Sequence, residues 1–435
     1  MSLFGALNTA VSGLGAQAAA FSNIGDNIAN SQTTGYKGVN TSFEDYLTVS
    51  NLQVNQSGSV VAKPDYANSL QGAVSQSSNP LAMAITGQGF FTISQQIGTS
   101  KGNPVFSNQI SYTRTGDFVV NRDGYLVNSA GNFLTGHVQD LVTGGIDRTS
   151  VAPIHIGENS YAPVPTSEVT LSANLPATPS ATAPIVAQVP VTDALGQSQT
   201  VQLQWTQVVG SPNTWQVAVS QAGAASSLGT AKVVFGTAGD PAAPDGTPGS
   251  IVSTAGNATG STYAAGSPAT LGFTADFGSG PQAISINLGI FGQASGLTQF
   301  AGTEYSPRSL TQNGVAPGSF SSVSAQSNGD IVVNFDNGQA RVVANVPITT
   351  FSNPDALQRL SGQAFQSTIS SGSPQVLQAG SNGAGTIVNN ALEGSNIDIA
   401  TEFTKLIVAQ RAYSANTKMV TTADELLQQT IDMKR

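Results

Sequence analysis

The C-terminal end of the chain decides the fold, and there residues 399–431 read IATEFTKLIVAQRAYSANTKMVTTADELLQQTI. Ten positions of this stretch follow one another in steps of four and three residues, and seven of the ten are apolar. The apolar positions are Ile399, Phe403, Leu406, Tyr413, Val420, Leu427 and Ile431. Such spacing is typical of a helix that packs along a seam with a period of 3.5 residues. The sequence therefore predicts a C-terminal coiled-coil helix.

A second stripe, with a period of seven residues, lies at the N-terminus. It consists of Leu7, Leu14, Phe21 and Ile28, and small residues such as Gly13 occupy most positions between them. Because a glycine costs about 1 kcal/mol inside a helix, this helix needs packed neighbours. Either stripe alone is also compatible with an ordinary core helix. Two stripes at opposite ends favour a helix pair that packs against other copies of the chain, so the apolar residues of both are the predicted assembly interface.

The composition is typical of an extracellular, β-rich protein. Charged residues make up only 9% of the chain, whereas glycines number 47. The net charge of −9 and the lack of a Lys/Arg cluster argue against nucleic-acid binding. The absence of cysteine excludes disulfides and thiolate metal sites, so packing and assembly must stabilise the fold. Neither end contains the run of about 18 apolar residues that a membrane span needs, so no membrane insertion is expected.

The middle of the chain is predicted to be mainly β and nested. Short β-like runs follow the first helix, and a Pro-rich joint that begins at Pro163 marks a boundary. The segment after the joint has strands of its own, anchored by Trp205 and Trp215. The predicted parts are terminal coiled-coil helices at 1–33 and 396–435, extended linkers at 34–70 and 362–395, a first β-rich domain at 71–164 and 303–361, and an inserted outer β-domain at 165–302.

Two local patterns complete the predicted β structure. The Gly/Ala/Ser/Thr-rich sequence between residues 220 and 270 is expected to form surface loops. Strands at 331–335 and 339–343 flank Asp336-Asn337-Gly338 and predict a hairpin. Its turn is expected to be of type I′, because Asn-Gly accepts the positive φ that such a turn requires.

Residues that could carry catalysis are scarce. His137 and His155 are too few for a three-histidine zinc site, and neither lies in an HExxH motif. Gly87-Gln88-Gly89 lacks the rest of a dinucleotide fingerprint and is interpreted as a tight turn before a buried aromatic strand. Asn121-Arg122-Asp123-Gly124 lacks the glutamate of a calcium loop and is interpreted as a β-turn. No enzyme activity, cofactor or metal site is therefore expected, although abundant serines leave a Ser/His/Asp triad as an open alternative.

Five sequence blocks, in order along the chain, resemble the bacterial flagellar rod and hook protein family. The first block runs from Asn27 to Lys37, and its signature residues are Asn27, Ala29, Asn30, Thr33, Gly35, Tyr36 and Lys37. The blocks at 84–91 and 112–126 resemble the family's first globular domain. The blocks at 395–403 and 410–422 resemble its C-terminal helix. The resemblance covers roughly residues 1–140 and 385–435.

The inserted domain distinguishes members within this family. Members with such a domain are hook proteins, and the start of the domain resembles theirs at Asn174-Leu175-Pro176 and Asp193-Ala194-Leu195-Gly196. A distal rod protein is the alternative. The resemblance implies a structural subunit of a flexible tube, a universal joint that transmits motor torque from rod to filament. It also implies a set of partners: other copies of the chain, the rod, hook-filament junction proteins, the hook cap and the type III export apparatus. The expected location is the extracellular flagellum, reached without a cleaved signal peptide.

Two functions from other classes remain as alternatives. A secreted adhesin would share the strand-rich middle, but it would more often have a cleavable signal or a cell-wall anchor and does not need paired terminal helices. A secreted hydrolase would need polar groups that converge in a pocket.

Overall fold

The computed structural model describes residues 3–50, 55–100, 102–140, 144–157, 160–180, 183–224 and 226–433. Strands make up 43% of it and a helix lies near each terminus, which confirms the mainly β architecture with helical ends. The chain divides into two compact units. Unit 1 comprises Met1–Asn159, Ser321–Asn334 and Ala340–Arg435, and unit 2 comprises Ser160–Phe320 and Phe335–Gln339. The second unit is thus inserted within the first, as the nested prediction requires.

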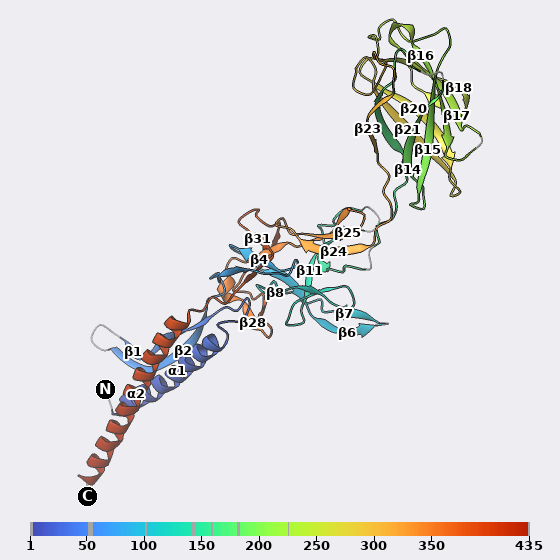
Figure 1. The fold of residues 1–435 in the computed structure, drawn as a ribbon. Coiled ribbons are helices and arrows are strands. Elements are labelled where there is room, and N and C mark those ends of the chain that lie inside the picture. The colour runs from blue at the N-terminus through green and yellow to red at the C-terminus, as the bar shows by residue number, and fades with distance from the viewer. Residues whose placement is uncertain are drawn as a thin grey trace. The chain divides into compact units, whose positions relative to one another are not determined.

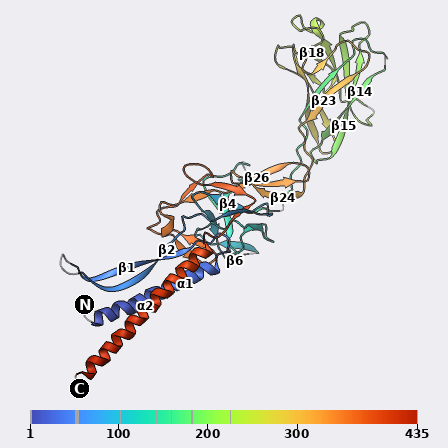
Figure 2. The ribbon, with the colours of Figure 1, turned by 60° about the vertical axis from the view of Figure 1, so that its left-hand side comes forward.

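The two terminal helices of unit 1 lie side by side and run in opposite directions (Figure 1, Figure 2). They are α1 (Leu3–Ala29) and α2 (Ile399–Asp432). The start of α2 is set by Asp398, whose carboxylate accepts a hydrogen bond from the backbone N–H of Thr401 at 2.7 Å. Hydrogen bonds from Thr401 also lower the pKa of Asp398. A charged N-cap therefore fixes where the C-terminal helix begins.

Residues 34–70, predicted to be an extended linker, contain a long β-hairpin. Its strands are β1 (Val39–Ser50) and β2 (Asn55–Tyr66), which pair antiparallel. The hairpin lies beside α1, and Asn8 Nδ2 of that helix donates a hydrogen bond to Gly58 O of β2 at 2.8 Å. Both the hairpin and α2 therefore supply the packed neighbours that the glycines of α1 require.

The β part of unit 1 is built on an eleven-stranded sheet. Its main path is β24 (Phe320–Ala325), β25 (Asp330–Phe335), β26 (Ala340–Asn345), β11 (Phe133–Val138), β5 (Phe91–Ser94), β8 (Ser111–Thr113), β29 (Ala364–Gln366) and β28 (Gln358–Leu360), with β9 (Val119–Val120), β10 (Leu126–Val127) and β12 (Ala152–Pro153) beside it. Two-stranded sheets complete it: β3 (Val74–Gln76) with β32 (Ala391–Glu393), β4 (Met83–Thr86) with β31 (Thr386–Asn389), β6 (Gln96–Ser100) with β7 (Asn103–Phe106), and β27 (Ile348–Thr350) with β30 (Gln375–Leu377). The short helix η2 spans Pro354–Ala356.

Two turns predicted in unit 1 are confirmed. Gly87 and Gly89 have φ values of 100° and 124° and lead into Phe90 and the buried strand β5. Such φ values favour glycine, which explains the spacing of the two residues. The β-turn before Gly124 lies between β9 and β10, and the Gly124 N–H donates to Asn121 O at 3.1 Å.

The hairpin of β25 and β26 is also confirmed, but its turn differs from the predicted type. A type I′ turn needs a positive φ at two residues, and here Gly338 has it, at 78°, whereas Asn337 does not. The Gly338 N–H donates to Phe335 O, and the Phe335 N–H donates to Gln339 O. Three residues rather than two therefore separate the closing pair, which produces a type I turn followed by a glycine bulge.

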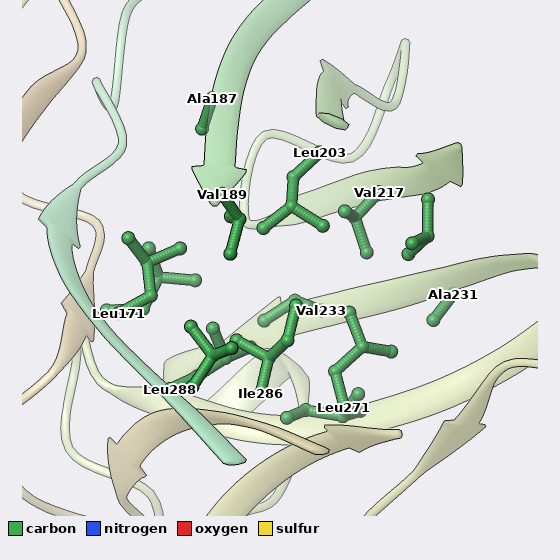
Figure 3. Packing of buried hydrophobic residues seen from close by; sticks show 14 of the residues in the cluster. Leu171, Ala187, Val189, Leu203, Val217, Ala231, Val233, Leu271, Ile286 and Leu288 are labelled. Carbon is green, nitrogen blue, oxygen red and sulfur yellow. The ribbon is translucent and has the colours of Figure 1, made fainter. Parts of the chain in front are cut away.

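Unit 2 consists of two packed sheets. The six-stranded sheet contains β13 (Glu168–Asn174), β19 (Thr259–Gly260), β20 (Pro268–Asp276), β21 (Pro281–Ile290), β22 (Leu297–Thr298) and β23 (Ser306–Gln312). The five-stranded sheet contains β14 (Ile185–Thr192), β15 (Ser198–Gln207), β16 (Thr214–Gln221), β17 (Gly229–Phe235) and β18 (Pro248–Gly256), and η1 (Gly236–Ala238) follows β17. Figure 3 shows apolar side chains of both sheets, among them Leu203 and Ile286, that meet in one core. Trp205 and Trp215 are buried in this core, as predicted.

The structure corrects the loop prediction for residues 220–270, because most of β17 to β20 lies there. Strand β17 alternates buried and more exposed positions, but small residues such as Ala231 occupy some of the buried ones. The usual contrast of apolar and polar residues is therefore weak in the sequence. Strand β23 pairs with β13 as well, so the sheet of unit 2 extends past residue 302, where the inserted domain was predicted to end.

Candidate assembly surface and the joint of unit 1

Most residues of helix α2 are exposed in the subunit. Of its 34 residues, the buried ones are Glu402, Ala409 and Ala423. Its exposed apolar side chains are Ile399, Phe403, Ile407, Val408, Tyr413, Met419, Leu426 and Ile431. Phe403 is 51% exposed and Ile431 is 65% exposed. At 3.6 residues per turn these side chains, which we call the α2 row, lie on both sides of the buried positions along the helix. Their number marks a surface for contact with protein.

The predicted interface residues fall into two groups. Ile399, Phe403, Tyr413 and Ile431 are exposed, whereas Leu406, Val420, Leu427 and the predicted residues of α1 (Leu7, Leu14, Phe21 and Ile28) are half-buried. The buried residues of the helix pair are mostly small: Ala10, Ala16 and Ala20 with Ile24 and Asn27 in α1, and Ala409 and Ala423 with Glu402 in α2. Small side chains allow two helices to approach closely. The seam within the subunit therefore uses a narrower face than the large-residue stripe, no member of which is fully buried.

A groove of about 400 Å³ lies between α1, α2 and β1. Ala20 and Ile24 of α1, Phe43 of β1 and Val408 of α2 are among its lining residues. The rings of Phe21 and Tyr413 also join the two helices, and they meet edge to face with centroids 6.2 Å apart. The helix pair thus combines an apolar hollow with an exposed apolar row.

Asn27, Tyr36 and Lys37 of the predicted signature lie where the end of α1 meets the starts of β1 and α2. Asn27 is buried, and its Nδ2 donates to Val39 O at 2.9 Å and to Glu402 Oε2 at 3.1 Å. Its Oδ1 accepts from the Val39 N–H and from Tyr36 Oη. One amide therefore joins α1, the start of β1 and the start of α2, and Lys37 follows directly in the same segment.

Lys37 belongs to a buried cluster of three charges. Its Nζ lies 2.6 Å from Glu393 Oε1, and Arg114 Nη1 lies 3.0 Å from Glu393 Oε2. All three side chains are at most 2% exposed. Burial lowers the pKa of Lys37 and of Arg114, and the attraction of Glu393 opposes this shift in both. Since loss of one member of a buried pair leaves an uncompensated charge, each removal costs about 3–5 kcal/mol.

The remaining signature residues have local roles. The side chain of Asn30 donates to Asp26 O and accepts from Thr33 Oγ1, which closes the turn after α1. Gly35 has a φ of 68°, and its N–H donates to Glu393 O at 2.8 Å. Ala29 is exposed at the end of α1.

Arg359 forms a second contact centre close to Lys37. Its Nη2 donates to the backbone oxygens of Lys37 and Gly38 and to Asn68 Oδ1. Its guanidinium lies over the ring of Tyr66, 5.0 Å from the centroid. Burial lowers the pKa of Arg359 as well. The joint between the terminal elements and the β part of unit 1 is therefore held by polar contacts on two sides.

Sequence reasoning missed Glu393 and Arg359. Only 9% of the residues of the chain are charged, so a charged residue within an otherwise uncharged segment, as at Glu393, was an available signal. Glu393 ends the short strand β32, two residues before the block at 395–403 that resembles the family. Its partners lie 279 and 356 residues away in the sequence, so periodicity could not reveal them.

The chain contains a Gly-x-Ser-x-Gly pattern, Gly98-Thr99-Ser100-Lys101-Gly102, which sequence reasoning overlooked. That pattern requires a strand-to-helix turn, whereas Gly98, Thr99 and Ser100 lie in β6, which pairs with β7. Among the described residues, no group of three or more His, Asp or Glu side chains could hold a metal ion. Within the same ranges, no helix combines the length and hydropathy needed to cross a membrane.

Comparison with known proteins covers the whole chain. Family models match in chain order: "Flagella basal body rod protein" at residues 7–37, "Flagellar hook protein FlgE/F/G D1 domain" at 84–164, "Flagellar basal body protein FlaE D2 domain" at 163–315, and "Flagellar basal body rod FlgEFG protein C-terminal" at 388–433. The flagellar hook protein FlgE of Brucella melitensis is 32% identical over 443 aligned residues, which include 100% of both chains. This chain belongs to the flagellar hook protein family.

A second relative and a solved structure are also similar to the chain. The FlgE protein of Rhizobium meliloti is 28% identical and covers 100% of both chains. A crystal structure of the Helicobacter pylori hook protein FlgE2 matches with a TM-score of 0.46 and 15% identity, over 73% of this chain and 100% of that one. As a hook family member, the chain is a structural subunit of the bacterial flagellar hook. The exposed row on α2 is thus found in a protein that self-assembles.

Proposed function

We propose that the hook subunit assembles through the apolar row of α2 and the half-buried stripe of α1. The observation that supports this most directly is the burial of only three of the 34 residues of α2. An exposed helix with so many large apolar side chains gains stability when a second surface covers it. In the assembled state, each subunit supplies this cover to its neighbours.

The length of the helices suits an axial stack. At 1.5 Å per residue, the 27 residues of α1 extend about 40 Å and the 34 residues of α2 about 51 Å. Contacts between different faces of identical subunits generate an open helical array unless the rotation closes a ring. Side-by-side stacking of these helix pairs therefore builds a tube whose wall consists of terminal helices.

The inserted unit 2 is proposed to face outward and to give the tube its flexibility. All seven residues of β23, among them Ser306, Arg308 and Gln312, are exposed, and the composition of this part is polar and weakly charged. Surfaces of that kind form weaker contacts than apolar ones and can slide past each other. Sliding between outer units permits bending, while the helical wall transmits motor torque from rod to filament.

The partners of this tube follow from its place in the flagellum. We infer that the subunit contacts the rod at one end of the hook and the hook-filament junction proteins at the other, and that the hook cap and the type III export apparatus handle it during growth. Its working location is then the extracellular part of the flagellum, reached without a cleaved signal peptide. Support for these inferences comes from membership of the hook family.

The terminal helices are expected to fold stably only on assembly. Limited proteolysis of soluble monomer should remove about 30–70 residues from the N-terminus and about 40 from the C-terminus, because helices with little burial open at low free energy. Mass spectrometry of the fragments checks the result, and purified hooks treated in parallel are the control, since their ends should resist. A monomer whose ends resist equally would contradict the proposed assembly role.

A further inference from the structure

Glu393 holds together the three crossing segments of unit 1, which connect α1 with β1, β2 with β3, and β32 with α2. The segment leaving α1 contributes Lys37 Nζ at 2.6 Å and the Gly35 N–H, which donates to Glu393 O at 2.8 Å. The segment returning from the hairpin contributes the Gly72 N–H, which donates to Glu393 Oε1 at 2.8 Å. The segment entering α2 contains Glu393 itself. The β part contributes Arg114, whose Nη1 and Nη2 also donate to the backbone oxygens of β4 and of Gly87.

The crossing segments are packed too closely to act as loose linkers. A Cβ placed on Gly72 would lie 2.1 Å from the backbone oxygen of Gly394, and one on Gly38 would lie 2.4 Å from Ile397 Cδ1. Strands β3 and β32 also pair here, with Val74 opposite Glu393. Backbone contact of this closeness leaves no room for the segments to move past one another without breaking hydrogen bonds.

The buried charges of the cluster make separation of the crossing segments costly. Glu393 is the one carboxylate between Lys37 and Arg114, and all three side chains are shielded from water. If one segment moved away, a buried cation or the buried carboxylate would be left without its partner, which is far more costly than the loss of a surface pair. The same carboxylate therefore opposes the separation of any of the crossing segments.

We propose that Glu393 is the positioning residue that makes the helix pair, the β1–β2 hairpin and the β part of unit 1 respond to force as one body. This inference rests on the proposed torque-transmitting function and adds the residue through which load passes from the helical wall to the first β domain. A joint tied at one carboxylate keeps the exit direction of both terminal helices fixed. Flexibility of the hook then arises elsewhere than at this joint.

The test compares Glu393→Gln with Glu44→Gln. Glutamine keeps an acceptor for the Gly72 N–H but removes the charge that balances Lys37 and Arg114. Glu44 is the matched control, because its pair with Lys63 is equally short at 2.6 Å but about half exposed. Hydrogen exchange of purified hooks, in which the terminal helices are expected to be folded, is followed by mass spectrometry. It should be at least about tenfold faster in residues 35–38, 70–74 and 391–397 of Glu393→Gln than in wild type. The control should exchange as wild type does.

Preserved protection of these segments in folded Glu393→Gln would overturn the inference. If that variant does not fold, Lys37→Gln replaces it, because Arg114 then keeps its partner and the same faster exchange is expected at 35–38 and 70–74. Preserved protection there would also overturn it. A second readout is the shape of hooks from cells that carry Glu393→Gln: tubes should still form, since the α2 row is unchanged, but their persistence length in electron micrographs should fall. Normal tubes with normal stiffness would count against the joint and leave the assembly role intact.

Discussion

Replacement of Phe403 by aspartate is expected to abolish hook assembly while the subunit stays folded. Phe403 is 51% exposed in the single subunit, so the new carboxylate remains hydrated there. In the tube the same position is proposed to be covered by a neighbour, where an unpaired charge costs several kcal/mol. Because every subunit repeats the contact, the penalty recurs along the whole polymer. Electron microscopy and sedimentation of purified protein measure the loss of tubes.

Thr421→Asp is the matched control for this experiment. It adds the same charge to α2 at an exposed position whose neighbours three and four residues away along the helix are all polar. Circular dichroism should show an unchanged β signal for both variants, and Thr421→Asp should still assemble. Leu427→Asp is also expected to block assembly, but Leu427 is half-buried, so this change also affects the subunit itself. Tubes of normal length from Phe403→Asp would mean that the exposed row has no role between subunits.

Deletion of the inserted unit is expected to leave a subunit that still forms tubes, but straight ones. The strand pairing shows where to cut, because β13 and β23 pair with each other and must be removed together. The bridges Tyr161↔Gly318 and Val164↔Val315 place the two chain ends next to each other. Removal of residues 161–318 with a short Gly/Ser connection therefore requires little loop closure. Tubes should retain the proposed helical wall, and they should be straight because we propose that contacts between outer units curve the tube.

The control for the deletion is a shorter cut that removes only residues 165–302. That cut leaves β23 without β13, so an exposed strand edge should make this variant prone to aggregate. Cryo-electron microscopy of the longer deletion measures curvature, and circular dichroism of its monomer checks the fold of unit 1. Failure of unit 1 to fold, or curved tubes of wild-type shape, would contradict the proposed role of unit 2.

The sequence by itself determined the features that depend on short-range pattern. The period of the two stripes was sufficient to predict α1 and α2, whereas the cap at Asp398 became visible only in the structure. The alternation of apolar and polar residues, together with the two tryptophans, was sufficient to predict the strands around Trp205 and Trp215. The sequence blocks near both ends of the chain were sufficient to identify the resemblance to the family. These features could be predicted because each is encoded within one segment, whereas the small-residue strands β17 and β18 gave too little contrast between faces.

Only the tertiary structure decided which faces of these elements are covered. A helical period states that one face is apolar, but it does not state whether the neighbour is the same chain or another copy. Here the small face around Ala409 and Ala423 packs inside the subunit, and the large face around Phe403 stays free. The Glu393 cluster could not be predicted from the sequence either, because the partners of Glu393 come from residues 35–37, 72 and 114. Contacts between segments hundreds of residues apart arise from the fold as a whole, and local sequence carries no record of them.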